Sequence, residues 1–261
     1  MSDHPLDAPI VVNRLFYPRK AERGTSVVPN TVDGTVVVDE ANNIEIGYRM
    51  YQPAVAKTVI LFFHGNGEVA SDYDMIAGQF LQLDTILIIA DYRGYGWSTG
   101  TPLTSKMLPD AEAIANALPE ILGDHASLPR IIMGRSLGSA SAIYLAHTMQ
   151  TQFKALILDS AFAEVPSILR LLGMALTSFS TQKMPVENAK RMESIHLPLL
   201  VIHGEEDSLL TIHNGEKLYN ASPATDKTFL RVPQAGHNNV MYYAGDNYFN
   251  SINALITKAI N

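Results

Sequence analysis

The sequence predicts an α/β fold, in which helices cover both faces of a mostly parallel sheet. Two observations lead to this prediction. Short apolar segments rich in β-branched residues alternate with longer amphipathic segments along the chain, and this alternation is typical of parallel strands joined by helices. The chain has 261 residues, of which 47% are hydrophobic, which is enough for one large domain with its own core. We therefore expect a single domain over residues 1–261.

Eight segments have the length and composition of strands. They are Thr35–Asp39, Ile44–Tyr51, Thr58–His64, Thr85–Tyr92, Arg130–Arg135, Ala155–Asp159, Pro198–His203 and Thr228–Val232. Only Glu40 to Asn43 separate the first two segments. So short a connection is typical of a hairpin, and we expect this pair to be antiparallel.

Five segments have the amphipathic pattern of helices. They are Glu68–Gln82, Leu108–Leu122, Leu137–Met149, Thr211–Asn220 and Val240–Ile260. The residues before Thr35 are interrupted by Pro18 and Pro29, and we expect them to wrap around the outside of the sheet. An insertion over about 161–196 is long and rich in Leu, Met and Phe. It predicts a short helical lid over the end of the sheet, with an ordinary packed helix as the alternative.

The composition excludes several classes of protein. A formal net charge of -7 without a long basic run argues against nucleic acid or an anionic membrane as the main partner. The absence of cysteine excludes disulfides, thiolate catalysis and cysteine-ligated metals. The sequence has no apolar run of membrane-spanning length and no signal peptide at its start. We expect a cytoplasmic protein.

No metal or other cofactor is expected. His203, Glu205, Glu206 and Asp207 resemble metal ligands in composition, but such close positions do not easily converge on one ion. The glycine-rich loop Arg93–Trp97 has the spacing of neither a phosphate-binding loop nor a dinucleotide fingerprint.

The segment RIIMGRSLGSASA, residues 130–142, carries the most chemical information. An apolar strand leads into Gly134–Arg135–Ser136–Leu137–Gly138, and small residues then open a helical pattern. This order of strand, G-x-S-x-G and helix predicts a nucleophile elbow, a tight turn that projects the serine hydroxyl from the strand end. Ser136 is therefore the candidate nucleophile.

A second G-x-S-x-G occurs at Gly96–Gly100. It lies in a glycine-rich loop and runs into Thr101 and Pro102, with no strand before it and no helix after it. We interpret Ser98 as a loop serine.

Two further polar residues follow strands in the order that a catalytic triad requires. Asp207 comes after the strand Pro198–His203, and His237 comes after the strand Thr228–Val232. His237 would act as general base and later as general acid for Ser136, and Asp207 would orient the imidazole. Other carboxylates stay open as the acid, namely Glu205, Glu206 and Asp159.

The same chemistry needs two donors that face the charge developing on the substrate oxygen. One candidate is the backbone N–H of Leu137, directly after the nucleophile. The other is the N–H of Asn66, in the glycine-containing loop after Thr58–His64, with Gly67 as the alternative. Glycines let such a backbone approach a substrate closely.

The motifs in this order resemble the α/β-hydrolase fold serine hydrolases. They are FFHGNGE (62–68), DYRGYGWSTG (91–100), GRSLGS (134–139), LDSAF (158–162), HGEEDSLL (203–210) and AGHNN (235–239). The chain is most similar to the small single-domain depalmitoylase-like members and their soluble bacterial relatives. The resemblance implies an eight-stranded sheet with an antiparallel second strand, the triad Ser136, Asp207 and His237, and an oxyanion hole at Asn66 and Leu137. Many such relatives carry an N-terminal membrane helix or acylated cysteines, which this sequence lacks, so depalmitoylation at membranes is not expected.

The sequence thus predicts a serine hydrolase that cleaves acyl esters or thioesters of small molecules. Leu169, Leu172, Met174 and Phe179 of the expected lid suggest an apolar acyl chain. Gly67, Tyr95, Trp97 and Met174 are candidate substrate-binding residues, although packing explains Tyr95 and Trp97 equally well. A serine peptidase or aminopeptidase would use the same machinery, and a non-catalytic binding module would keep only the fold.

Overall fold

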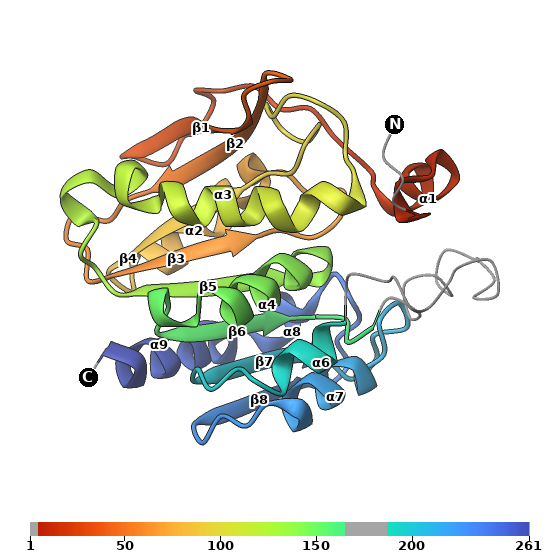
Figure 1. Ribbon diagram of the computed structural model, residues 1–261. Helices are drawn as coiled ribbons and strands as arrows, with labels where there is room; N and C mark the ends of the chain where they lie inside the picture. The colour runs from red at the N-terminus through yellow and green to blue at the C-terminus, as the bar shows by residue number, and fades with distance from the viewer. Residues whose placement is uncertain (1–4, 165–186, 261) are drawn as a thin grey trace. The chain divides into compact units, whose positions relative to one another are not determined.

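The computed structural model describes residues 5–164 and 187–260. It contains an eight-stranded, mostly parallel sheet with helices, which confirms the predicted fold class (Figure 1). The chain divides into two compact units, residues 1–130 and 131–261. The strand order is β1-β2-β4-β3 in the first unit and β5-β6-β7-β8 in the second. A single folded domain stays a prediction.

The strands of the first unit combine an antiparallel hairpin with a parallel pair. They are β1 (Thr31–Asp39), β2 (Ile44–Tyr51), β3 (Thr58–Phe63) and β4 (Thr85–Ala90). The predicted hairpin is confirmed, since β1 and β2 pair antiparallel, whereas β3 and β4 pair in parallel. Strand β1 begins earlier than expected because Thr31 pairs with Tyr51 at the far end of β2. This strand boundary therefore depends on pairing rather than on composition.

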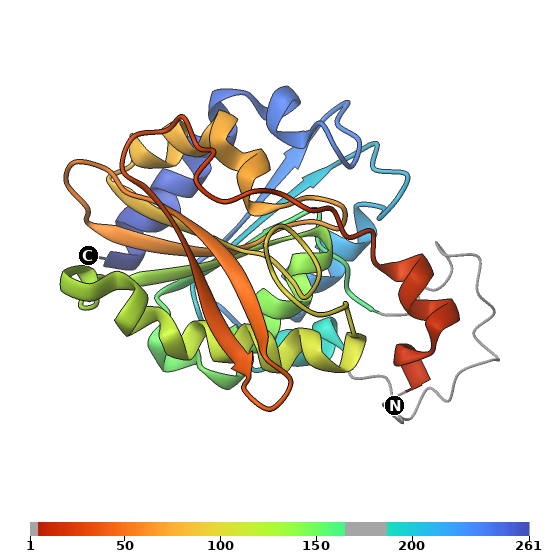
Figure 2. The ribbon, with the colours of Figure 1, turned by 90° about the horizontal axis from the view of Figure 1, so that it is seen from above.

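Two longer helices lie on opposite sides of these strands, α2 (Asp74–Leu81) and α3 (Thr104–Leu122) (Figure 2). Helix α3 begins before the expected Leu108. The Asp7 carboxylate accepts the Ser105 N–H at 3.0 Å, and the Thr104 hydroxyl donates to the Leu6 carbonyl at 3.0 Å. The N-terminal segment thus satisfies backbone and side-chain groups at the start of α3. This segment also contains a short helix, α1 (Pro9–Leu15), which sequence analysis did not predict.

The second unit is a parallel sheet. Its strands are β5 (Arg130–Arg135), β6 (Ala155–Asp159), β7 (Leu199–Gly204) and β8 (Lys227–Val232). Its helices are α4 (Ser139–Thr148), α6 (Asn188–Met192), α7 (His213–Ala221), α8 (Val240–Ala244) and α9 (Asp246–Ile260). Figure 2 shows α4 on one side of these strands and α8 and α9 on the other. The helix expected over Val240–Ile260 is divided at Gly245, whose φ of 54° ends α8.

Strands β3 and β4 form the core of the first unit, and β6 and β7 form that of the second, because every residue of each strand is buried. Such uninterrupted apolar strands are typical of sheets covered on both faces. None of the helices within the described ranges has the length and apolarity needed to cross a bilayer.

The expected lid over 161–196 lies mostly outside the described residues, which leave out 165–186. Its two described ends are joined, because the Asn188 side chain donates to the Phe162 carbonyl at 2.9 Å. Met192 and Ile195 are fully buried. Leu169, Leu172, Met174 and Phe179, on which the acyl-chain prediction rests, fall outside the described ranges.

Candidate active site

Ser136 occupies a strained turn between β5 and α4. Its φ is +49°, in the left-handed region that non-glycine residues rarely adopt. A 3-10 turn over Ser136–Gly138 joins the strand to the helix. A side chain at Gly134 would lie 2.5 Å from the Gly138 carbonyl oxygen, so glycine permits this close approach of strand and helix. A strained backbone of this kind costs about 1–3 kcal/mol and is typical of functional sites.

The imidazole of His237 contacts the Ser136 hydroxyl. His237 Nε2 lies 2.9 Å from Ser136 Oγ, and the ring comes from the loop that follows β8. The backbone of this loop is tied to the nucleophile strand, because Arg135 Nη2 donates to the His237 carbonyl at 3.0 Å and to Asn238 Oδ1 at 3.2 Å. The residue next to the serine therefore helps to hold the histidine that contacts it.

Asp207 lies on the other side of the imidazole. Its Oδ2 is 2.7 Å from His237 Nδ1, and its Oδ1 accepts the N–H groups of Leu209 at 2.9 Å and Leu210 at 2.8 Å. Since a carboxylate only accepts, Nδ1 carries a hydrogen and Nε2 is free to accept the hydroxyl hydrogen of Ser136. The three side chains thus form a continuous hydrogen-bonded series in the second unit.

The surroundings of Asp207 favour the charged form of its carboxylate, although the side chain is buried. Burial alone would raise the pKa of Asp207, but hydrogen bonds from His203, His237 and the Leu210 N–H outweigh it. The charge of His237 acts in the same direction, so the pKa lies well below the usual carboxyl value. The side chain therefore stays ionised at neutral pH.

The loops after β7 and β8 are packed directly against each other. The Glu206 N–H donates to the Ala235 carbonyl at 2.9 Å. A side chain at Gly204 would lie 2.3 Å from that same carbonyl oxygen. Only glycine allows the two loops to approach this closely, and their approach brings Asp207 and His237 within hydrogen-bonding distance.

The alternative acids are engaged elsewhere or exposed. Asp159 Oδ1 accepts the Ser160 hydroxyl at 2.8 Å, and Asp159 Oδ2 accepts the Tyr248 hydroxyl at 2.8 Å. Glu205 and Glu206 are exposed, whereas Asp207 is buried. Of the four carboxylates considered from the sequence, Asp207 alone bonds to His237 among the hydrogen bonds of the described residues.

The loop after β3, which holds Asn66 and Gly67, is fastened within the first unit. The Asn66 side chain donates to the Leu15 carbonyl at 2.6 Å and accepts the Tyr95 hydroxyl at 2.6 Å. Gly67 has a φ of 77°. Asn66 and Leu137 belong to different units, so their pairing in an oxyanion hole stays a prediction.

Tyr95 and Trp97 both have packing partners. Tyr95 is fully buried against His64 and Tyr92, with ring centroids 5.8 and 5.4 Å away. Trp97 Nε1 donates to the Gly34 carbonyl at 3.0 Å. These contacts account for both residues within the fold, and a role in substrate binding stays a prediction for them.

Ser98 is a loop serine, as predicted. It lies outside the helices and strands and is buried, and its hydroxyl oxygen accepts the Gly47 N–H at 2.8 Å. The hydroxyl therefore joins its loop to strand β2. Ser98 lacks the positive φ that marks Ser136.

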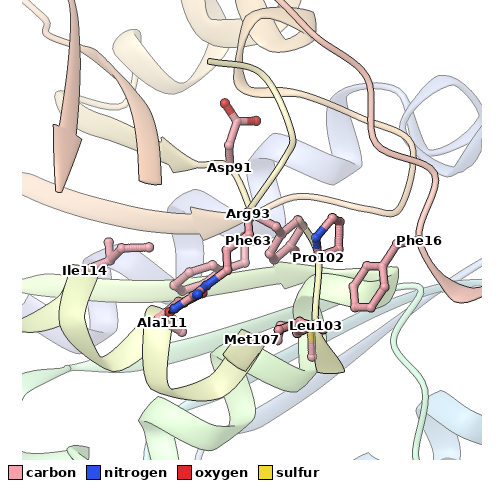
Figure 3. A pocket seen from close by; sticks show the side chains of 11 residues that line it. Phe16, Phe63, Asp91, Arg93, Pro102, Leu103, Met107, Ala111 and Ile114 are labelled. Atoms are coloured by element: carbon pink, nitrogen blue, oxygen red, sulfur yellow. The ribbon is translucent and has the colours of Figure 1, made fainter. Parts of the chain in front are cut away.

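Figure 3 shows a small apolar cavity in the first unit. Its volume is about 10 Å³, which is room for about one water-sized sphere. The lining includes Phe16, Phe63 and Met107, and the Asp91 carboxylate points away from these side chains. The cavity is too small for an acyl substrate, and none of Ser136, Asp207 and His237 lines it.

Sequence analysis missed the parts played by His203 and Arg135. The sequence placed His203 only in a group that resembles metal ligands, whereas its Nε2 lies 2.7 Å from the Leu210 carbonyl oxygen and 3.4 Å from Asp207 Oδ2. Arg135 was treated only as the variable residue of G-x-S-x-G. The position of Arg135 next to Ser136 was a usable signal, whereas His203 is recognisable only once Asp207 is known as its neighbour.

A metal centre finds no support in the described part of the chain, where no group of three or more His, Asp or Glu side chains is arranged to hold an ion. Glu205 and Glu206 are exposed, whereas His203 and Asp207 are buried.

Comparison with known proteins identifies relatives across most of the chain. A family model described as serine aminopeptidase, S33, matches residues 54–188. The chain is 24% identical over 244 residues to YNL320W, an uncharacterized membrane protein of Saccharomyces cerevisiae, covering 89% of this chain and 85% of that protein. It is 30% identical over 195 residues to lysophosphatidylserine lipase ABHD12 of Rattus norvegicus, covering 67% of this chain and 48% of that protein.

Among solved structures, the Pyrococcus furiosus esterase Pf2001 has the same fold. The TM-score is 0.72 at 19% sequence identity, and the match covers 90% of this chain and 98% of the esterase. This similarity confirms the α/β-hydrolase fold.

Proposed function

We propose that this chain, which belongs to the serine aminopeptidase S33 family of hydrolases, cleaves acyl ester or thioester bonds through a covalent Ser136 acyl-enzyme. One observation carries the proposal. The hydroxyl of Ser136, the imidazole of His237 and the carboxylate of Asp207 are joined by hydrogen bonds of 2.9 and 2.7 Å. This is the arrangement that activates a serine as a nucleophile.

The reaction begins when Ser136 Oγ attacks the substrate carbonyl carbon and its proton passes to His237 Nε2. Asp207 accepts the Nδ1–H, keeps the ring in the productive tautomer and stabilises the imidazolium that forms. The imidazolium then gives its proton to the leaving alcohol or thiol as the bond to the carbonyl carbon breaks. Water attacks the acyl-enzyme by the same steps and releases the acid. Positioned proton transfer of this kind contributes about 10²–10⁴-fold to the rate.

The developing oxyanion is assigned to the backbone N–H groups of Leu137 and Asn66. Leu137 directly follows the nucleophile. Asn66 is preferred to Gly67, because the Asn66 side chain is held by Leu15 and Tyr95. Losing one such donor costs about 10²–10³-fold in kcat.

The proposed substrate is a small molecule with an acyl group. The names of the relatives support this class, since one is a lipase and one an esterase. The apolar residues of the expected lid, including Met174, favour an apolar acyl chain, and Gly67, Tyr95 and Trp97 remain candidate contacts.

Aminopeptidase activity is the second candidate, because the description of the matching family names it. Amide cleavage would use the same three side chains, but an aminopeptidase also needs an acidic group that binds the free amine of the substrate. Aminoacyl p-nitroanilides and p-nitrophenyl esters separate the two activities. Faster cleavage of the anilides would favour the peptidase.

The first experiment measures initial rates on p-nitrophenyl esters of increasing acyl length, with Ser136→Ala as the blank. A Ser136-dependent maximum at short or medium chains would support the esterase and measure the acyl pocket. A fluorophosphonate probe should label Ser136 in the wild type. A folded protein that shows neither labelling nor Ser136-dependent turnover would instead be a binding module without catalysis.

A cytoplasmic location stays a prediction, and the yeast relative is named as a membrane protein. Fractionation of cells expressing this chain would test the location directly. Recovery in the membrane fraction would contradict the prediction.

A further inference from the structure

A second histidine lies beside the carboxylate of Asp207. His203 is in strand β7, and its side chain and that of Asp207 are both fully buried. His203 Nε2 is 2.7 Å from the Leu210 carbonyl oxygen and 3.4 Å from Asp207 Oδ2. The same Oδ2 also contacts His237 Nδ1 at 2.7 Å. Two imidazoles therefore meet one carboxylate oxygen.

The contacts of His203 determine where its ring hydrogen lies. A peptide carbonyl only accepts, so the nitrogen facing Leu210 must be a donor. Nε2 therefore carries a hydrogen directed at the Leu210 carbonyl, with Asp207 Oδ2 as a more distant second acceptor. On the opposite side of the ring, Nδ1 has no hydrogen-bond partner among the described residues. A side chain at Gly215 would lie 2.9 Å from Nδ1, so the backbone of α7 approaches the ring closely there.

His203 and Asp207 both hold the backbone of Leu210. Leu210 donates its N–H to Asp207 Oδ1 and receives the hydrogen of His203 on its carbonyl. The terminal torsion of an aspartate is broad, so donors on both oxygens are needed to set the plane of the carboxylate. His203 contributes directly at Oδ2 and, through Leu210, at Oδ1.

We propose that His203 is a positioning residue for Asp207, which holds Oδ2 toward His237 by fixing the loop Asp207–Leu210. This inference rests on the proposed Ser136 mechanism. His203 touches none of the reacting atoms in that mechanism, and it acts only through the acid.

The ionisation of Asp207 is consistent with this arrangement. Burial opposes the charged carboxylate, and the contacts of Asp207 with His203 and His237 both lower the pKa of Asp207. Without His203, a buried carboxylate would lose one of its compensating donors.

The test compares His203→Gln with His203→Asn on a short-chain p-nitrophenyl ester. Both variants are polar, but the longer glutamine can place an N–H near the position of Nε2, whereas asparagine cannot reach Leu210. We expect His203→Asn to lower kcat by about 10- to 100-fold with little change in KM, since small misplacement of a catalytic group has costs of this size. His203→Gln should recover most of kcat. Thermal melting of both variants establishes that they are folded.

His213→Asn is the matched control. His213 also contacts a carboxylate, with Nδ1 2.7 Å from Glu216 Oε2, but its side chain is 83% exposed. Its replacement should leave kcat and KM unchanged. If His213→Asn lowered kcat as much as His203→Asn does, the effect would not be specific to Asp207.

A double-mutant cycle separates positioning from a general structural role. Asp207→Ala removes the group through which His203 is proposed to act, so adding His203→Asn should then lower kcat no further. An equal loss in both backgrounds, or a loss confined to KM, would overturn the proposal. Turnover that persists in Ser136→Ala would instead overturn the proposed function. Ser136-dependent turnover that is unaffected by His203→Asn would overturn only the role of His203.

Discussion

In each unit, a His-Gly dipeptide lies at the carboxyl end of a buried strand. The two histidines differ in the groups that surround them. In the first unit, His64 follows β3, and both ring nitrogens face acceptors. Nδ1 lies 2.8 Å from the Gly65 carbonyl, and Nε2 lies 3.1 Å from Asp91 Oδ1. In the second unit, Nε2 of His203 faces two acceptors, and Nδ1 has no hydrogen-bond partner in the part of the chain that the structure describes. The same dipeptide thus places acceptors at both ring nitrogens in one unit and at one ring nitrogen in the other.

The comparison extends to the catalytic side chains. The first unit also contains a G-x-S-x-G serine, a buried histidine and a buried aspartate, in Ser98, His64 and Asp91. Yet Asp91 Oδ1 accepts from His64 and from the Ala70 N–H, and Ser98 accepts from a backbone N–H. The presence of a serine, a histidine and an aspartate in one unit is therefore not sufficient to form a triad. A strained serine at a strand end, joined to the histidine, distinguishes the second unit.

The largest expected effect tests this distinction between the two units. Ser136→Ala and His237→Ala should each lower kcat by about 10⁴- to 10⁶-fold, and the double variant should be little worse, because the triad acts as a unit. Initial rates on the best p-nitrophenyl ester provide the measurement. Multiplicative losses in the double variant would show that the two residues act independently.

The next effect concerns the acid. Asp207→Asn should lower kcat by about 10³- to 10⁴-fold, because an amide can hold the wrong imidazole tautomer. Asp159→Asn is the matched control, since Asp159 is buried in the same unit but bonds to Ser160 and Tyr248. If Asp159→Asn were the more damaging change, the assignment of the acid to Asp207 would be wrong.

The two units should also respond oppositely to pH in their contribution to stability. Burial opposes a charged His64, but the hydrogen bond and charge of Asp91, helped by Glu68, raise the pKa of His64. Its stabilising contribution is complete below the unfolded value of about 6.5 and is lost as the pH rises through the folded value. The lowered pKa of Asp207 gives a contribution that is present above about 3.9 and is lost as the pH falls through the folded value.

Urea unfolding across pH measures both contributions. The difference in free energy of unfolding between wild type and His64→Gln should shrink as the pH rises above neutral. The difference between wild type and Asp207→Asn should shrink toward low pH. A pH-independent difference for His64→Gln would mean that the ring does not gain a proton on folding.

The smallest expected effect is at the second G-x-S-x-G. Ser98→Ala should leave kcat/KM unchanged and lower the free energy of unfolding by about 1 kcal/mol, the value of one buried hydrogen bond. The ester assay and urea unfolding measure the two quantities. Loss of activity in a folded Ser98→Ala protein would mean that this loop contributes to the reaction.

Local pattern was enough to predict the fold class and most of the elements. Strands β2, β5 and β6 have the predicted bounds because their β-branched runs end at turn residues. The errors have two kinds of cause. The start of α3 depends on Asp7, which lies far away in sequence. The division between α8 and α9 is local and depends on the backbone conformation of Gly245.

The candidate site also shows what local sequence pattern can and cannot predict. Strand-end position and chain order were sufficient to select Ser136, Asp207 and His237, which the structure brings within hydrogen-bonding distance. Their catalytic roles remain proposals. The contacts of His203 and Arg135 depend on how loops from separate strands pack, and no sequence spacing encodes that packing.

The close contact at Gly204 restricts which sequences can preserve this site. Every other amino acid would place a Cβ atom 2.3 Å from the Ala235 carbonyl oxygen, whereas the neighbouring Glu205 is exposed. In a library of variants selected for turnover, position 204 should therefore keep one amino acid while position 205 accepts many. Selection for turnover would then restrict the amino acid at a position that has no side chain and takes no part in the reaction.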